Sequence, residues 1–192
     1  TEPECENAWD FVTGQIDESI TLYAKWTPAN GLQLQQADTL TAGSTLTLMS
    51  SNRVKNNKHM YVSFDAEDIG TGTVRIGHGK TQYGSEYIEL TASQLAVKTY
   101  TNSVSTVGPY THNLDLTGTV EVTIDAGVNT ATITVTCGGQ TYTRSNVTWS
   151  ACNGDIYVET DGVTLTDVDA HWWCDDYSSD IWFFGDSWFS YS

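Results

Sequence analysis

The sequence has few basic residues. Among its 192 residues, 8 are Lys or Arg and 24 are Asp or Glu, which gives a formal net charge of −16 at pH 7. Proteins that bind nucleic acid or anionic lipid neutralise phosphates with clustered Lys and Arg side chains. A chain this acidic offers no basic stripe of that kind, so we expect neither a nucleic-acid partner nor an anionic membrane partner.

Long apolar runs are also lacking. The longest are a few residues, far short of the roughly 20 residues that a membrane-spanning helix requires. No stretch begins with basic residues and continues into an apolar segment, as a secretory signal does. We therefore expect no membrane insertion, and we expect any export signal to lie upstream of Thr1.

Cysteines are sparse and widely spaced. The chain has four, Cys5, Cys137, Cys152 and Cys174, with none of the paired short spacings of a zinc site. An exported chain could oxidise four cysteines in three ways. We favour a bond between Cys152 and Cys174, which end strand-like segments; the alternative is that the cysteines are small buried thiols.

Helical periodicity is absent, and strand-like alternation takes its place. Short runs rich in Thr, Val, Ile and Tyr alternate apolar with polar residues, as strands with one solvent-facing side do. The runs are residues 44–49, 60–64, 73–76, 87–90, 95–97, 120–124, 131–135, 141–143, 156–158 and 163–165. Residues 120–147 form two consecutive hairpin patterns. The pattern predicts an all-β fold, an antiparallel β-sandwich or jelly roll.

The two ends of the chain differ from this central region. We place the sandwich at residues 29–178, between the proline and glycine of residues 27–31 and the acidic, serine-containing stretch of residues 174–179. Residues 1–28 and 179–192 are predicted to be short pieces of neighbouring modules.

Residues 5–27 resemble the closing third of a Listeria-Bacteroides repeat, a small β-grasp module of bacterial surface proteins. The matching parts are Trp9-Asp10-Phe11 and the terminal strand Ile20-Thr-Leu-Tyr-Ala-Lys-Trp26. The resemblance implies that residues 1–28 end such a repeat and that the chain is extracellular or attached to a cell surface.

Residues 180–189 resemble the first block of the SGNH (GDSL-type) hydrolases, an apolar strand that runs into Gly-Asp-Ser. Here the strand is residues 181–184 and the motif is Gly185-Asp186-Ser187. By this resemblance Ser187 would be the nucleophile of an intact hydrolase, Gly185 would permit the sharp turn and the Ser187 amide would help to hold an oxyanion. Residues 181–189, if not covered by a following domain, are predicted to pack back on the sandwich or on a second copy of the chain.

The rest of that catalytic machinery does not follow. The family's later glycine, asparagine and Asp-x-x-His are missing after Ser187, and His59, His78, His112 and His171 all precede it. A serine without a base is a weak nucleophile. We expect no activity from these 192 residues, and the resemblance implies a serine esterase or hydrolase in a longer protein.

The central region resembles a concanavalin-like or laminin-G-like domain over residues 74–89 and Cys152-Asn-Gly154. The resemblance implies a β-sandwich with a carbohydrate-binding face. Sugars stack on aromatic rings and accept hydrogen bonds from nearby polar groups. The predicted ligand-binding residues are His78, Tyr83, Tyr87, Trp172 and Trp173. The alternative for the tryptophans is that residues 171–173 form the last strand, with one ring in the core; Trp149 is assigned to the core.

No metal site is predicted. Acidic groups such as Asp65 with Glu67 and Asp68, or Asp167 with Asp169, have the oxygen chemistry for calcium. No complete ligand loop is present, and a solvated acidic surface explains these residues without a cofactor.

The leading hypothesis is an accessory domain, carbohydrate-binding or spacer, that presents an SGNH-type esterase of the same polypeptide at the cell surface. Its partners would be a glycan and that hydrolase domain. The competing hypothesis is a purely structural domain that makes protein contacts in an adhesin-like surface protein.

Overall fold

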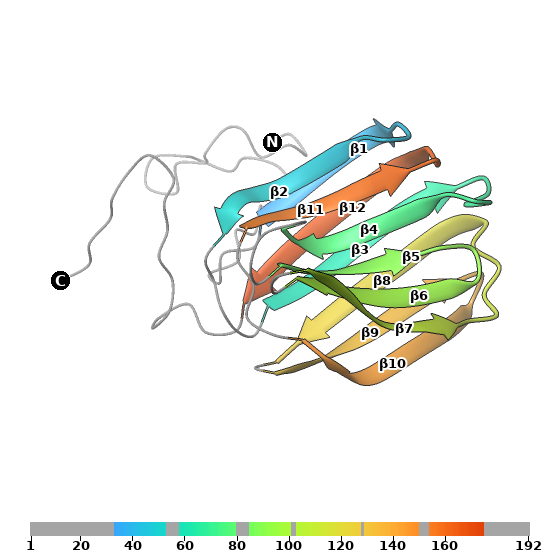
Figure 1. Cartoon of the computed structure of the whole chain (residues 1–192). Coiled ribbons are helices and arrows are strands. Elements are labelled where there is room, and N and C mark those ends of the chain that lie inside the picture. The colour runs from blue at the N-terminus through green and yellow to red at the C-terminus, as the bar shows by residue number, and fades with distance from the viewer. Residues whose placement is uncertain are drawn as a thin grey trace, which may run out of the picture.

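The structure is a computed structural model, and it describes residues 33–52, 58–79, 85–100, 103–127, 129–149 and 154–174. All regular elements in these ranges are strands, and they form two antiparallel six-stranded sheets (Figure 1). No helix in the described ranges is long and apolar enough to cross a membrane. The β-grasp and Gly-Asp-Ser resemblances, Cys5 and Cys152 lie outside the described residues.

Sheet A contains six strands in the spatial order β1-β12-β3-β8-β9-β10. Their bounds are β1 (Gln33–Leu40), β12 (Leu165–Cys174), β3 (Lys58–Ala66), β8 (Gly118–Ala126), β9 (Thr130–Cys137) and β10 (Gln140–Thr148). The predicted pair of hairpins over residues 120–147 is confirmed by the consecutive antiparallel pairing of β8, β9 and β10.

Sheet B has the order β2-β11-β4-β5-β6-β7. Its strands are β2 (Thr45–Asn52), β11 (Gly154–Asp161), β4 (Thr73–His78), β5 (Ser85–Leu90), β6 (Gln94–Tyr100) and β7 (Val104–Thr111). The last two strands of the chain insert next to the first ones, so the ends of the described sequence lie side by side in both sheets (Figure 1). The fold is the predicted antiparallel β-sandwich of jelly-roll type.

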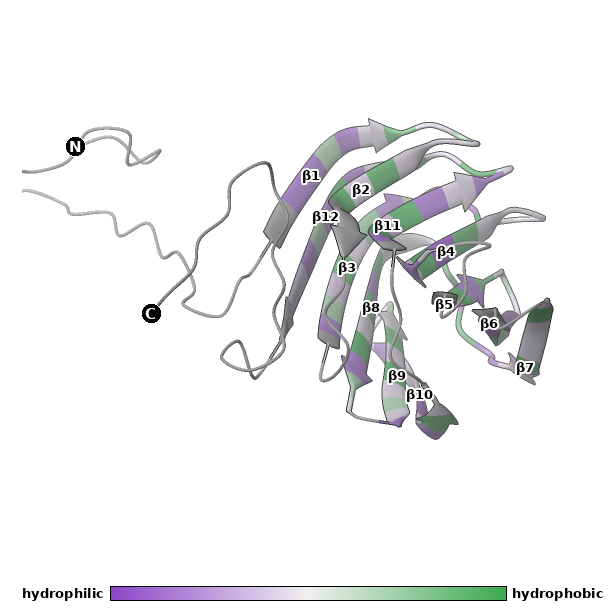
Figure 2. Ribbon diagram, turned by 60° about the vertical axis from the view of Figure 1, so that its left-hand side comes forward, coloured by the Kyte–Doolittle hydropathy of each residue, from purple (hydrophilic) through white to green (hydrophobic). Residues whose placement is uncertain are grey.

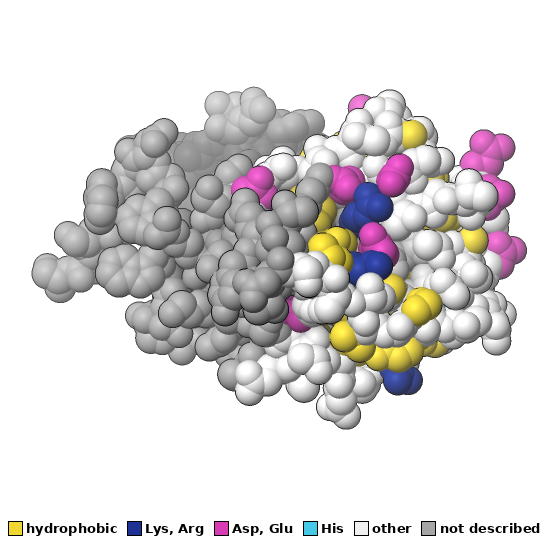
Figure 3. All heavy atoms as spheres, viewed as in Figure 1, with side chains coloured by type: hydrophobic (Ala, Val, Ile, Leu, Met, Phe, Trp, Pro, Cys, Tyr) yellow, Lys and Arg dark blue, Asp and Glu magenta, His cyan; other side chains and the backbone are white. Residues whose placement is uncertain are grey.

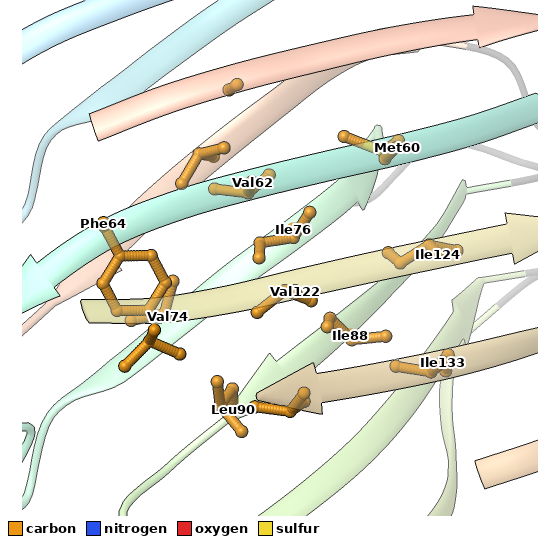
Figure 4. Close-up of a cluster of buried hydrophobic side chains, with 14 of the residues drawn as sticks. Met60, Val62, Phe64, Val74, Ile76, Ile88, Leu90, Val122, Ile124 and Ile133 are labelled. Atoms are coloured by element: carbon orange, nitrogen blue, oxygen red, sulfur yellow. The ribbon is translucent and has the colours of Figure 1, made fainter. Parts of the chain in front are cut away.

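The core lies between the sheets because the strands alternate. Along β9, every second residue is buried and the residues between them are exposed or half-buried. Figure 2 shows a similar banding of hydrophilic and hydrophobic residues along several strands. Inward-facing side chains from both sheets interdigitate in Figure 4, among them Val62, Phe64 and Ile124 from sheet A and Ile76 and Ile88 from sheet B. Each contributes roughly 1.5–3 kcal/mol by its burial. Trp149 is buried with them, as predicted.

One strand differs from the sequence-based expectation, and one of the two alternatives for the cysteines can be compared with the structure. The run 163–165 is not a separate strand: only Leu165 belongs to the long strand β12, which continues to Cys174. Cys137 is a free, buried thiol whose Sγ donates to the Thr117 carbonyl at 3.3 Å, as the buried-thiol alternative expected. The pairing of Cys152 with Cys174 stays a prediction, because Cys152 and the Cys174 side chain lie outside the described part.

Candidate functional site

The predicted ligand-binding residues do not form one cluster. His78 is 1% exposed and Trp172 is 0% exposed, so both rings lie in the interior rather than on a surface open to a ligand. The His78 ring lies edge-on to Trp149, with 6.4 Å between centroids. The burial of Trp172 matches the alternative in which one tryptophan of the last strand belongs to the core.

The other predicted residues lie on opposite outer faces. Tyr87 belongs to β5 and points away from the core on sheet B, since its neighbours Ile88 and Leu90 alternate with it. Trp173 is half-buried on the outer face of sheet A, where it stacks on His59. Tyr83 lies outside the described residues. Ligand binding by these five residues therefore stays a prediction, and no single surface contains them all.

The outer face of sheet B carries a line of paired polar side chains that the sequence patterns did not single out. We call it the charged row. It takes one residue from each of the six strands, namely Thr45, Glu159, Arg75, Glu89, Lys98 and Thr106. The strand register places Glu159 beside both Thr45 and Arg75, and places Arg75 beside Glu89. Arg75, Glu89, Lys98 and Thr106 lie on the consecutive strands β4 to β7, and the inserted strand β11 brings Glu159 and Thr45 next to them.

Arg75 is the centre of the row. Its Nε donates to Glu89 Oε1 at 2.9 Å and its Nη1 donates to Glu159 Oε1 at 2.8 Å. Its Nη2 reaches Asp161 Oδ2 at 3.3 Å. Because all three guanidinium nitrogens have a carboxylate partner, the Arg75 side chain is held in one orientation.

Lys98 extends the row to the edge strand. Its Nζ lies 3.0 Å from Glu89 Oε2 and donates to Thr106 Oγ1 at 3.0 Å. At the other end, Thr45 Oγ1 donates to Glu159 Oε2 at 3.2 Å. Figure 3 looks onto this face and shows Lys and Arg side chains among acidic ones.

The contacts within the row favour the charged forms of Glu89 and Arg75. Burial alone would raise the pKa of Glu89, but the hydrogen bonds from Arg75 and Lys98 outweigh it and hold that pKa below its ordinary value. Burial would lower the pKa of Arg75, and its bonds to Glu89 and Asp161 raise it instead. The result is an array of fixed ionic donors and acceptors, each partly exposed to solvent.

Two tyrosines adjoin the charged row. Tyr87 and Tyr157 each lie next to Gly77 in the strand register, with 6.4 Å between ring centroids. Burial raises the pKa of both phenols, so both are neutral at physiological pH. Gly77 has φ of +152°, and a Cβ there would lie 2.5 Å from the Glu86 carbonyl oxygen. A glycine is therefore required between the rings.

No metal centre accompanies this face. Among the residues that the structure describes, no group of three or more His, Cys, Asp or Glu side chains converges to hold an ion. The tyrosine rings are buried, with Tyr87 8% and Tyr157 1% exposed. This face therefore presents hydrogen-bonding charged groups to solvent, which suits hydroxyl-rich ligands.

Solved structures share the arrangement of the two sheets. The exoplasmic/lumenal domain of VIP36, in its Ca2+/Man2-bound form, matches with a TM-score of 0.53 and 8% sequence identity over 77% of this chain and 82% of that one. The Caenorhabditis elegans galectin LEC-6 matches with a TM-score of 0.50 and 6% identity over 71% and 94% of the two chains. What these structures share with this chain is the two-sheet β-sandwich fold.

A more distant similarity involves an enzyme. The exo-inulinase from Aspergillus awamori matches with a TM-score of 0.47 and 17% identity over 73% of this chain, which spans only 28% of the inulinase. No protein-family model matches the sequence, and no curated protein matches it significantly.

Proposed function

We propose that this sandwich is a carbohydrate-binding module and that the outer face of sheet B is its ligand surface. The observation that carries the proposal is the charged row, which crosses all six strands and fixes partly exposed ionic hydrogen-bonding groups on one outer face. Sugar hydroxyls both donate and accept, so a surface of alternating carboxylates and cations can pair with neighbouring hydroxyls of one ring.

The row is ordered before any ligand arrives. Each charged group is already held by a partner on the next strand, so little side-chain entropy remains to be lost on binding. The VIP36 domain, which has the same fold, is known in a Man2-bound form, and this supports a saccharide as the class of ligand.

At a finer level, we propose an extracellular or cell-surface accessory domain that delivers an SGNH-type esterase to its substrate. The Gly185-Asp186-Ser187 resemblance, in the residues that follow the last described strand in the sequence, motivates this context. Glycan binding would then raise the concentration of the esterase near a polysaccharide.

The test is a glycan-array screen of the 192-residue chain, followed by isothermal titration of each selected glycan. We expect Glu89→Gln to weaken binding about tenfold or more, because it removes the negative charge that both cations share and replaces one acceptor oxygen with a donor. Thr143→Val, on the outer face of sheet A, is the control and should bind as the wild type does. Absence of glycan binding, or binding that Glu89→Gln leaves unchanged, would overturn the proposal.

One observation favours a purely structural role as the second candidate. The charged groups of the row already pair with one another. A network of this kind can have the single role of holding the six strands in register, without any ligand. In that case Glu89→Gln would lower the melting temperature while the array shows no selected glycan.

A further inference from the structure

A second group of aromatic side chains lies on the opposite outer face, on sheet A. We call it the aromatic patch. Its four rings come from two adjacent strands, β3 and β12, and three carboxylates on β8 and β12 border them. The rings are His59, Tyr61, His171 and Trp173, and the carboxylates are Glu121, Asp125 and Asp169.

The register explains why these side chains meet. On β12, positions 171 and 173 alternate with the buried Ala170 and Trp172, so they face outward. β3 pairs His59 with Trp173 and Tyr61 with His171 across the strands. β8 then places Asp125 beside His59 and adds Glu121 two residues from the partner of Tyr61.

Each ring is held by a specific contact. Trp173 stacks on His59 with 5.3 Å between centroids and an interplanar angle of 18°, and His59 Nδ1 lies 2.5 Å from Asp125 Oδ1. Tyr61 meets His171 edge-on with 5.6 Å between centroids.

The polar atoms of the other two rings also reach carboxylates. The Tyr61 hydroxyl donates to Glu121 Oε1 at 2.8 Å. His171 Nε2 lies 3.0 Å from Asp169 Oδ1. The rings thus have fixed orientations, and they are half-buried on the outer side of the sheet, opposite the core.

The charge of the patch selects among ligands. The described side-chain contacts of its carboxylates are to imidazole rings and a phenol, whereas the charged row on sheet B pairs carboxylates with Arg75 and Lys98. Three carboxylates around aromatic rings attract a cation and repel an anion, in a chain whose net charge is already −16. A pyranose ring that carries an ammonium group can stack on the aromatic rings and pair with a carboxylate at the same time.

We propose that the aromatic patch is a second saccharide site, specific for glycans that contain hexosamine with a free amine. The sugar ring packs on the aromatic rings, and its ammonium group pairs with Asp125 or Glu121. This site is separate from the sheet B face, since the two surfaces lie on opposite sides of the core.

The experiment is isothermal titration of the 192-residue chain with a β-1,4-linked glucosamine tetramer and with its fully N-acetylated counterpart. We expect the free-amine tetramer to bind about tenfold tighter or more, since one screened charge-assisted contact is worth on the order of 1.4 kcal/mol. We also expect its affinity to fall as salt is added. Equal or tighter binding of the acetylated tetramer, or no binding of either, would overturn the proposal.

Single substitutions test whether the tetramer binds at the aromatic patch. Asp125 is 65% exposed, so Asp125→Asn does not threaten folding, and it should weaken the free-amine tetramer about tenfold. Asp115→Asn removes the same charge from an exposed position before the opposite end of β8 and is the matched control. Trp173→Leu should abolish binding by removing the largest ring.

The outcomes also separate this site from the sheet B face. Loss of tetramer binding in Glu89→Gln with full retention in Asp125→Asn would place the ligand on sheet B. That result would overturn the second site while leaving the proposed function intact.

Discussion

Replacing Arg75 with methionine should remove the centre of the charged row while keeping the length of the side chain. Three contacts are lost at once, to Glu89, Glu159 and Asp161. A hydrogen bond to a sheltered charge contributes about 1.5–3 kcal/mol, and an exposed ion pair contributes about 0–1 kcal/mol. Arg75 is 24% exposed and lies between these limits, so we take about 1 kcal/mol for each contact and about 3 kcal/mol in total.

For a domain of this size, that loss corresponds to a fall in melting temperature of roughly 9 °C. The assay is thermal unfolding followed by circular dichroism at pH 7. Arg144→Met is the control, because Arg144 is exposed and lies over the Tyr110 ring at 4.0 Å, a contact worth about 0.5–1 kcal/mol. A fall of less than about 3 °C for Arg75→Met, or one no larger than that of the control, would refute the reasoning.

Three further predictions concern single residues. Gly77→Ala should lower the free energy of unfolding in urea by more than about 2 kcal/mol, because the added Cβ would lie 2.5 Å from backbone atoms. A variant as stable as the Gly127→Ala control would contradict this. Cys137 should resist thiol reagents in the native state, because burial raises the pKa of its thiol; modification at the unfolded-state rate would disprove it. Glu89 has a pKa below its ordinary value of 4.5, so its stabilising contribution is complete above that pH and is lost as the pH falls through the lowered pKa. The stability difference between wild type and Glu89→Gln should therefore shrink in acid, and a difference that grows below pH 4.5 would be contrary to this sign.

The strands that alternate cleanly could be predicted from the sequence, and those with unusual composition could not. Residues 120–124 and 131–135 were predicted within β8 and β9, because Val and Ile alternate there with Thr and Glu. β7 was missed because Gly108-Pro109 interrupts its pattern. β1 was missed because the consecutive Gln35 and Gln36, both exposed, give neither the alternation nor the composition typical of a strand.

The alternation of side chains along each strand predicts which residues of the candidate sites face the core. In β4 the inward positions Val74 and Ile76 are followed by His78, so the imidazole falls on the core side, and the same parity turns Trp172 inward. Parity also places Arg75 and Glu89 outward. The alternation does not show that Glu159 pairs with Arg75, because that contact depends on the insertion of β11 between β2 and β4.

The central claim is that saccharide binds to the outer face of sheet B. The most direct measurement is a titration of the isotope-labelled chain with an array-selected glycan, followed by amide chemical-shift mapping. The account predicts concentration-dependent shifts centred on Arg75, Glu89 and Lys98, and their loss in Glu89→Gln. Shifts confined to other surfaces, or none at saturating glycan, would contradict it.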